Sequence, residues 1–394
     1  MPKPDILTLV QQKNGKKSFH LAFFSPNSIF LLHSLRFLRP LRHLQMLLIT
    51  GWLGYIWSHA AVVFAQKWYD IVIIDNLSNT NLSVLEKLTT LIGKFTWRSR
   101  QPKFYQIDLK NTEEVRKVFH ENKIDGVIHF AAFKAVEESC EDPFKYYENN
   151  ISGGVSLYKV MNEFWIKNIV FSSSCTVYDT MNVTPPYDEQ TPKKTINPYG
   201  STKRMSEIIL EDLSTHKGFN TILLRYFNPI GAHPSGLIGE NPKGIPNNLL
   251  PYIYKVATGE YEFLNVRGND YPTPDGTCIR DYLHVMDLAE AHVSAYEYLQ
   301  KNKKFIPSSA GPEWFLDVFN LGTGQGTSVL EMIQLTEKAI DKKIPYKIWP
   351  RRAGDTPTVY ANPSKANTLL GRKTQKTILE AIQDGRRFIT KNNS

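Results

Sequence analysis

Short apolar runs alternate with stretches of helical periodicity from residue 46 onward, and this alternation limits the fold more than any other feature of the chain. Strands that alternate with helices are typical of a parallel sheet with helices on both faces. We therefore expect an α/β fold built on a doubly wound parallel sheet. The predicted strands are residues 46–50, 70–74, 104–107, 126–130, 169–172 and 221–224, and the predicted helices are residues 58–66, 112–122, 152–164 and 199–215.

The sequence pattern changes after about residue 228. Residues 229–248 and 267–276 are rich in glycine, proline and asparagine and are predicted to form long loops, which in compact domains usually carry function. Beyond them we predict helices at 285–300, 328–341 and 377–390, and strands near 318–321 and 346–348. The predicted organisation is an extension at residues 1–45, a first domain at 46–228 and a smaller α/β domain at 229–394.

The net charge of +9 lies mostly in residues 1–45. This segment holds seven basic residues and one acidic residue, which leaves +3 for the 349 residues that follow. The body of the chain therefore lacks the basic stripe of a nucleic-acid-binding surface. The apolar part of the segment is too short and too broken to span a membrane, although it could lie on a membrane surface. We favour a disordered tail, or upstream sequence that is not part of the native protein, with Met46 as the start.

The three cysteines, Cys140, Cys175 and Cys278, form no Cys-x-x-Cys pair. This spacing argues against both a disulfide framework and a zinc knuckle. We expect a cytoplasmic protein that carries no metal site.

A glycine-containing turn, Thr50-Gly51-Trp52-Leu53-Gly54, joins the first predicted strand to the first predicted helix. A Rossmann-type fold places its glycine-rich turn here, so that the helix N-terminus faces the pyrophosphate of a dinucleotide. Gly51 and Gly54 occupy the first two glycine positions, whereas Trp57 stands at the third. The turn therefore predicts a dinucleotide site with one serious departure, and an ordinary β–α turn is the alternative.

Acidic residues follow the next two strands. Asp75 ends the second strand, where a carboxylate binds the ribose hydroxyls and disfavours the extra phosphate of NADP. Asp108 follows the third strand and is placed to reach the adenine end. Asp75 thus favours NAD over NADP as the cofactor.

Tyr199 and Lys203 stand four residues apart on a predicted helix and therefore share one face. A nearby ammonium lowers the pKa of a phenol, which starts at about 10, so that the tyrosine can serve as a general base. Ser174 follows an apolar strand, where its hydroxyl could hydrogen-bond the reacting oxygen. In isolation the pair would more often be a solvated helix face, but its place behind a Rossmann half favours catalysis.

From Met46 nearly to the C-terminus, the sequence resembles a known family, the UDP-glucose 4-epimerases of the extended short-chain dehydrogenase/reductase superfamily. The resemblance spans some 340 residues. It rests on the stretches at residues 75–79, 129–136, 171–178, 197–200, 224–236, 244–249, 268–273, 280–285 and 351–355.

The resemblance implies a reaction and a set of site residues. A tightly held NAD would take a hydride from C4 of a UDP-hexose while Tyr199 removes the hydroxyl proton, Lys203 tunes Tyr199 and Ser174 binds the C4 oxygen. The 4-keto sugar would turn over and regain the hydride on its other face. The implied cofactor-binding residues are Gly51, Gly54, Tyr55, Ile56, Asp75, Asn76, Asp108, Phe130, Ala131, Lys134, Asn149, Tyr199, Lys203 and Tyr226. The implied substrate-binding residues are Ser174, Thr176, Tyr199, Asn228, Asn248, Arg280, Arg352, Asp355 and Val359.

The resemblance also implies a homodimer and a role in galactose metabolism. Relatives that dehydrate the sugar generally carry an Asp–Glu pair beside the serine, whereas this chain has Cys175 and Thr176 there. The sequence therefore favours an epimerase over a dehydratase or decarboxylase of nucleotide sugars. Val359 stands where the family varies a residue of the sugar pocket, and its small size predicts activity on UDP-N-acetylhexosamines as well.

Four tryptophans, Trp52, Trp57, Trp68 and Trp165, fall where the family normally has glycine. An indole at 57 would fill the contact between helix and strand, and overpacking by a few methylenes already costs about 1–3 kcal/mol. One hypothesis is an inactive, decayed relative. The other, which we favour, is a codon translated here as tryptophan that the source cell reads as glycine. Asp179 also stands where the family usually has glycine, and nothing in the sequence explains this substitution.

Overall fold

The computed structural model describes residues 7–13, 16–22, 45–51, 54–78, 82–93, 101–242, 244–304, 314–352 and 354–393. The chain divides into two units, Met1–Leu44 and Gln45–Ser394. In the first unit, β1 (Leu7–Lys13) pairs antiparallel with β2 (Lys16–Ala22). The other residues of this unit lie outside the described ranges, so the origin of the 1–45 extension stays a prediction.

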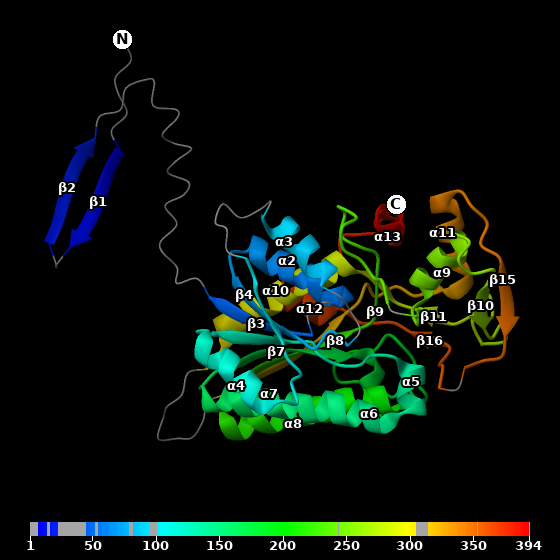
Figure 1. Cartoon of the computed structure of the whole chain (residues 1–394), viewed down its shortest axis with the longest axis horizontal. Coiled ribbons are helices and arrows are strands. Elements are labelled where there is room, and N and C mark those ends of the chain that lie inside the picture. The colour runs from blue at the N-terminus through cyan, green and yellow to red at the C-terminus, as the bar shows by residue number, and fades with distance from the viewer. Residues whose placement is uncertain are drawn as a thin grey trace, which may run out of the picture. The chain divides into compact units, whose positions relative to one another are not determined.

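The second unit is built on one seven-stranded parallel sheet, which confirms the predicted fold class. Its order is β13-β8-β7-β6-β3-β4-β5, and every neighbouring pair is parallel (Figure 1). The strands are β3 (Met46–Thr50), β4 (Asp70–Asp75), β5 (Lys103–Gln106), β6 (Gly126–His129), β7 (Asn168–Ser174), β8 (Asn220–Tyr226) and β13 (Phe315–Leu321).

Helices cover both faces of this sheet, because alternate residues of each strand point to opposite faces. Leu47 and Ile49 of β3 pack with α2 (Tyr55–Gln66), α3 (Ser83–Gly93) and α10 (Val285–Asn302). Leu48 packs on the other side with α4 (Thr112–Glu121), α7 (Gly153–Glu163) and α8 (Pro198–Lys217). The two layers lie above and below the sheet in Figure 1.

The order of the strands reverses between β3 and β6, which are neighbours in the sheet although β4 and β5 lie between them in the chain. Ligands of doubly wound folds bind outside the carboxyl ends of the strands at such a point. Gly51 follows β3 with φ of +74°, and a Cβ there would lie 2.5 Å from the Cα of Ala131, which follows β6. Glycine at 51 is therefore required by both the backbone and the close approach.

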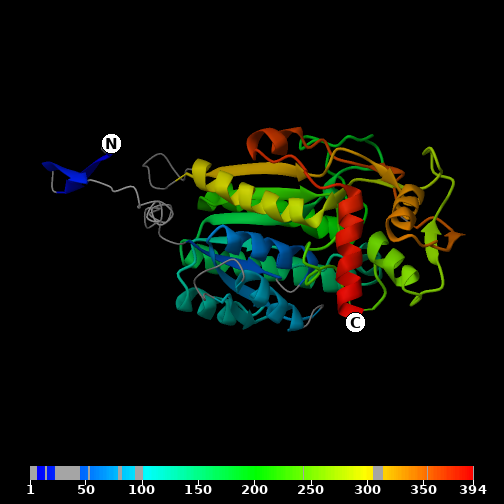
Figure 2. The ribbon, with the colours of Figure 1, turned by 90° about the horizontal axis from the view of Figure 1, so that it is seen from above.

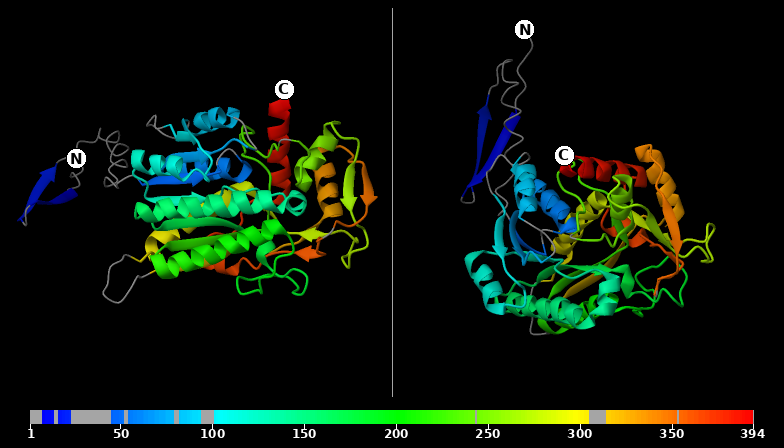
Figure 3. Two further views of the ribbon diagram at one scale, coloured as in Figure 1. Left: turned by 60° about the horizontal axis from the view of Figure 1, so that its bottom comes forward. Right: turned by 45° about the vertical axis from the view of Figure 1, so that its right-hand side comes forward.

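The C-terminal part of the chain adds a set of shorter elements at one end of the sheet (Figures 2 and 3). Its helices α9 (Leu249–Ala257), α11 (Val329–Ile340) and α13 (Ile378–Asn393) share one apolar core. Three small sheets complete it: β10 (Leu264–Arg267) with β15 (Tyr346–Trp349), β9 (Asn228–Ile230) with β12 (Tyr282–His284), and β11 (Ile279–Arg280) between β14 (Thr327–Ser328) and β16 (Thr358–Val359).

The large sheet and the C-terminal elements do not correspond to two consecutive segments of the chain. Helix α10, strand β13 and helix α12 (Ser364–Leu369) come late in the sequence but pack with the large sheet. Residues 136–152, which the sequence pattern left unassigned, form α5 (Val136–Glu141), α6 (Pro143–Tyr147) and a π-helical turn at Glu148–Ser152. The boundary predicted at residue 228 stays a prediction. Among the described residues, no helix is long and apolar enough to cross a membrane.

Candidate active site

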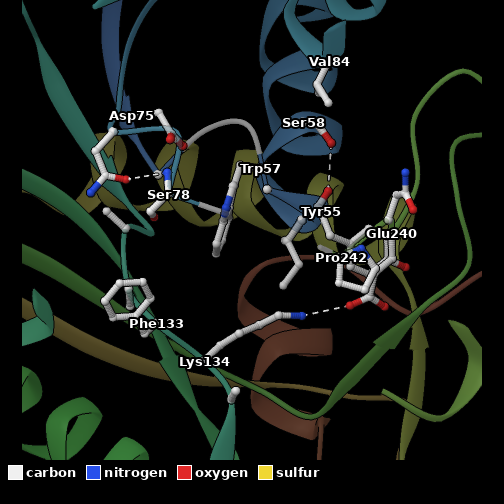
Figure 4. A pocket seen from close by; sticks show the side chains of 18 of the residues that line it. Tyr55, Trp57, Ser58, Asp75, Ser78, Val84, Phe133, Lys134, Glu240 and Pro242 are labelled. Atoms are coloured by element: carbon white, nitrogen blue, oxygen red, sulfur yellow. Dashed lines mark hydrogen bonds and ion pairs between the residues drawn. The ribbon is translucent and has the colours of Figure 1, made fainter. Parts of the chain in front are cut away.

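A cavity of about 490 Å³ lies at the carboxyl ends of β3, β4 and β6 (Figure 4). Most of the predicted cofactor-binding residues and one predicted substrate-binding residue line it. These are Gly51, Gly54, Tyr55, Ile56, Asp75, Asn76, Asp108, Ala131, Lys134 and Asn149, together with Asn248. The structure therefore brings together residues that are up to 197 positions apart in the sequence.

The N-terminus of α2 opens into this cavity. Its first residue is Tyr55, its N-cap is Gly54, and its first turn carries no side-chain cap and no acidic residue. The backbone N–H groups of a helix N-terminus suit an anion such as a pyrophosphate. Asp75 closes the far side at the end of β4, where its Oδ1 accepts a hydrogen bond from the amide of Leu77 at 2.6 Å. The turn predicted to bind phosphate and the carboxylate predicted to bind ribose thus both contribute to the lining of the cavity.

The indole of Trp57 does not fit such a ligand. Figure 4 shows it in the middle of the cavity, between Asp75 and Tyr55. Its ring lies on the ring of Phe130, with 4.0 Å between centroids, and its Nε1 sits so close to Gly54 that any Cβ there would collide with it. The indole therefore covers the glycine turn on the side where the pyrophosphate would bind.

The loop after β9 also contributes to the lining of the cavity. Its residue Glu240 was not among the predicted site residues. Glu240 accepts hydrogen bonds from Lys134 at 2.9 Å and from Asn248 at 2.6 Å. It thereby links a predicted cofactor-binding residue to a predicted substrate-binding residue. Figure 4 shows its ion pair with Lys134. The sequence offered one signal for Glu240, namely its place in a long loop rich in glycine, proline and asparagine.

Asn149 reaches the cavity from the π-helical turn, a feature often found at functional sites. Its side chain donates to Oδ1 of Asn150 at 3.0 Å. Asn150 in turn bonds both the backbone of Phe133 and the hydroxyl of Thr202 on α8. The cofactor cavity is therefore connected rigidly to the helix that carries Tyr199.

The predicted catalytic residues meet where β7 ends against the first turns of α8. Ser174 ends β7 and is buried, and Asn197 caps α8 by accepting from the amide of Gly200 at 2.8 Å. Lys203 is buried and donates to the backbone carbonyl of Ser172 at 2.7 Å, with its Nζ 6.0 Å from the ring centroid of Tyr199. Tyr199, Lys203 and Ser174 thus form one cluster.

The electrostatics of this cluster differ from the sequence expectation. Burial raises the pKa of Tyr199 to about 12, partly offset by a hydrogen bond to Ser174. Burial also lowers the pKa of Lys203 to about 7, which the charge of Glu207 opposes. In the protein by itself the pKa of Tyr199 is thus raised and not lowered, because loss of hydration is the largest effect on the phenol.

Two predicted substrate-binding arginines flank one carboxylate. Arg352 bonds Asp355 through Nη2 at 2.9 Å and Nε at 3.2 Å, and Arg280 approaches the same carboxylate at 3.6 Å. Val359 pairs with Arg280 across the β11–β16 ladder and packs with Val177 and Phe227. Two guanidinium groups with one shared acid leave a positive charge that suits a diphosphate.

The remaining predicted residues are placed less directly. The side chain of Tyr226 is buried and its hydroxyl bonds His292, so only its backbone could meet a cofactor. Phe130 is not part of the cavity lining, but its ring contacts Trp57, which is. The hydroxyl of Thr176 donates a hydrogen bond to the hydroxyl of Ser174 at 3.0 Å. Asn228 begins β9, opposite Tyr282 of β12.

A buried ion pair beneath this site was also missed from the sequence. Arg225 on β8 bonds both carboxylate oxygens of Glu207 on α8, at 2.8 and 2.9 Å, and both side chains are almost fully buried. Glu207 also accepts from Ser173 at 2.6 Å. The network joins α8 to the strand end that carries Ser174.

Comparisons with known proteins agree with this arrangement. The sequence model of the GDP-mannose 4,6 dehydratase family matches residues 48–385. The UDP-glucose 4-epimerase of Bacillus subtilis is 47% identical over 88% of this chain and 97% of its own length, and that of Schizosaccharomyces pombe is 46% identical over 87% and 93%. The crystal structure of the Bifidobacterium longum UDP-glucose 4-epimerase in complex with NAD+ and UDP is 44% identical, with a TM-score of 0.80 over 89% of this chain and 99% of that one.

The seven-stranded sheet, its glycine turn and the Tyr199–Lys203 pair on α8 define a short-chain dehydrogenase/reductase fold and site. Within that class, the sequence identity and coverage of the relatives identify the family. The chain belongs to the UDP-glucose 4-epimerase family.

Proposed function

We propose that the protein is an NAD-dependent UDP-hexose 4-epimerase that interconverts UDP-glucose and UDP-galactose through a 4-keto sugar. The observation that carries this proposal is the cluster of Tyr199, Lys203 and Ser174. Its helix α8 is linked through Asn150 to Asn149, in the cavity that Gly51, Gly54 and Asp75 also line. The proposal is supported by the 44% identity to an enzyme crystallised with NAD+ and UDP.

The bound nicotinamide supplies a reversible hydride acceptor for C4, so that no net oxidation occurs. Ser174 donates a hydrogen bond to the C4 oxygen, and Tyr199 accepts the proton of the C4 hydroxyl and later returns it. A pKa of about 12 means that Tyr199 is protonated in the protein by itself. A positive charge at the site would stabilise the phenolate, and Lys203 contributes part of that charge when it is protonated.

Arg280 and Arg352 are proposed to bind the diphosphate of the UDP-sugar. Both already face the Asp355 carboxylate, so their planar donors are oriented before the ligand arrives. Phosphate oxygens would take over part of the hydrogen bonding that Asp355 now receives. This arrangement would hold the nucleotide while the 4-keto sugar turns over between the oxidation of C4 and its reduction.

Val359 supports the finer proposal that N-acetylated sugars are accepted. Its side chain is small and buried in the cluster of Val177, Tyr178, Tyr187 and Phe227. A family member from Campylobacter jejuni, a UDP-Glc/GlcNAc 4-epimerase, is 33% identical to this chain. Turnover of UDP-N-acetylglucosamine would support the proposal, and turnover of only UDP-glucose and UDP-galactose would contradict it.

A coupled assay that detects UDP-glucose formed from UDP-galactose tests the main proposal. The chain is assayed with glycine and with tryptophan at residues 52 and 57, and Tyr199→Phe is the matched control in each form. We expect activity that the control abolishes. An NAD-loaded protein without activity would contradict the proposed function. The homodimer, the cytoplasmic location and the role in galactose metabolism remain proposals that rest on the family alone.

A further inference from the structure

Two tryptophans adopt a backbone conformation that belongs to glycine. Trp68 has φ of +70° and Trp165 has φ of +58°, and both side chains are exposed, at 46% and 77%. Left-handed φ costs a residue with a Cβ about 1–2 kcal/mol. Among the described residues only four other than glycine have positive φ, and two of these are tryptophans.

Both residues stand directly after the C-cap of a helix and form the same pair of hydrogen bonds. Trp68 donates to Ala65 at 3.0 Å and Tyr69 donates to Phe64 at 3.2 Å at the end of α2. Such a pair is the Schellman motif, whose left-handed residue is usually glycine.

The end of α7 repeats the motif. Trp165 donates to Asn162 at 3.2 Å, and Ile166 donates to Met161 at 2.8 Å. The ammonium of Lys167 lies 5.3 Å from the Trp165 ring, which is a weak cation–π contact at an exposed site. This contact offsets only part of the backbone cost.

Helix α9 shows the same motif with glycine in place. Gly259 has φ of +82° and donates to Val256 at 3.0 Å, while Glu260 donates to Lys255 at 2.9 Å. The three helix ends therefore have matching geometry, and only the residue at the left-handed position differs. Trp349, by contrast, lies within the extended strand β15, where a bulky aromatic residue is favoured.

Trp57 adds an independent observation at the cavity. Its indole contacts the tilted ring of Phe130 and covers Gly54, although Asp75, Gly51 and the N-terminus of α2 line the same cavity as proposed for a dinucleotide. Among the described residues of this site, Trp57 is the side chain that obstructs the turn, which suggests that its indole is not present in the working protein. Loss of function by random decay would not single out tryptophans at glycine geometry.

We propose that residues 57, 68 and 165 are glycine in the protein that the source cell makes, and that glycine at 57 opens the dinucleotide site. The codon UGA is read as tryptophan in some genetic codes and as glycine in others, so one codon would account for all three positions. The part that concerns residue 57 rests on the proposed NAD-dependent function. The part that concerns residues 68 and 165 rests on the backbone alone.

Calorimetric titration with NAD, without any UDP-sugar, tests residue 57. Trp52→Gly is carried in every protein compared, because residue 52 lies outside the described residues. We expect Trp57→Gly to lower the Kd for NAD by about 10–100-fold relative to Trp57 and to Trp57→Phe, which retains a ring. Equal affinity of the three proteins would overturn this part. Because no sugar is present, the result does not depend on whether the protein is an epimerase.

Thermal unfolding tests residues 68 and 165. We expect Trp68→Gly and Trp165→Gly each to raise Tm by about 1–3 °C. Trp68→Ala and Trp165→Ala keep the Cβ and should give no such rise, and Gly259→Ala should lower Tm. A fall in Tm for the glycine variants, or an equal rise for the alanine variants, would overturn the assignment.

The gene and the native protein give the direct answer. UGA at codons 57, 68 and 165, and glycine in the corresponding peptides by mass spectrometry, are the expected results. UGG at any of these codons, or tryptophan in the native peptide, would overturn the proposal at that position.

Discussion

The ammonium of Lys203 donates a hydrogen bond to the backbone carbonyl of Ser172, with 2.7 Å between Nζ and O. Lys203 is thereby fixed to the strand end that carries Ser174, 6.0 Å from the ring centroid of Tyr199. Its role in the protein by itself is to join α8 to β7. The effect of Lys203 on the Tyr199 phenol depends on whether Lys203 is protonated. Because burial lowers the pKa of Lys203 to about 7, its protonation changes around neutral pH.

The depressed pKa of Lys203 predicts a pH-dependent stability. Lys203 releases its proton near pH 7 in the folded protein, but only near pH 10.5 when unfolded. Between these values the unfolded chain binds more protons, so the contribution of Lys203 to stability rises with pH and is least favourable below pH 7.

Urea unfolding at pH 7 and pH 9 measures this effect. The free energy of unfolding should increase from pH 7 to pH 9 by more in the parent chain than in Lys203→Met. The exposed Lys159 provides the control, since Lys159→Met should leave the increase unchanged. An identical pH dependence in the parent and Lys203→Met would argue against the depressed pKa.

The buried pair of Glu207 and Arg225 predicts a large loss of stability on removal of one partner. Glu207→Gln leaves the Arg225 guanidinium buried without its carboxylate, and such a change costs about 3–5 kcal/mol. The double variant Glu207→Gln/Arg225→Met should be less destabilised than the sum of the two single variants. As a surface comparison, Glu113→Gln, which disrupts the exposed pair with Arg116, should cost far less stability than Glu207→Gln. Equal costs for the buried and surface pairs would contradict this prediction.

Tyr199→Phe should abolish turnover while it leaves the cofactor site intact. The substitution removes only the hydroxyl that exchanges a proton with the sugar, and Lys203 keeps its bond to Ser172. In the Trp52→Gly/Trp57→Gly background we expect kcat to fall by about 10²–10⁴-fold, a much larger change than that in the Kd for NAD. Retained turnover would assign the general base to another residue.

Arg352→Met should weaken the binding of UDP. Hydrogen bonds to charged groups contribute about 1.5–3 kcal/mol each, so the Kd for UDP should rise by about 10–100-fold. Arg351→Met is the matched control, because Arg351 bonds Asp270 on the exposed surface instead of Asp355. Calorimetric titration with UDP measures both variants, and equal effects would place the diphosphate elsewhere.

Asp75→Asn should reduce the preference for NAD over NADP. The carboxylate at the end of β4 repels a 2′-phosphate, and an amide of the same size does not. In the glycine background we expect the Kd for NADP to fall and that for NAD to rise. Equilibrium dialysis with each cofactor checks this, and an unchanged ratio of the two Kd values would contradict the placement of the ribose.

Much of the fold could be predicted from periodicity, because the central strands are buried on both faces and have continuous apolar sequences. Helix α9 was not among the predicted helices. Pro251 lies within the first turn of α9, where proline is tolerated. The order of strands and the return of β13 to the sheet are set by packing between distant segments.

The site was predictable where its residues form local motifs. Gly51, Gly54 and Tyr199 with Lys203 each belong to one short stretch of chain. Glu240 and the Glu207–Arg225 pair were not predictable, because their partners lie on other elements. The pKa of Tyr199 was misjudged because its burial cannot be read from the spacing of two residues.

The most direct measurement of epimerisation is a proton NMR time course of UDP-galactose with the NAD-loaded glycine form at residues 52 and 57. The sugar should convert into a mixture of UDP-galactose and UDP-glucose, with no stoichiometric release of NADH and no reaction in Tyr199→Phe. A 4-keto-6-deoxy sugar as the accumulating product, or unchanged UDP-galactose, would contradict the assignment as an epimerase.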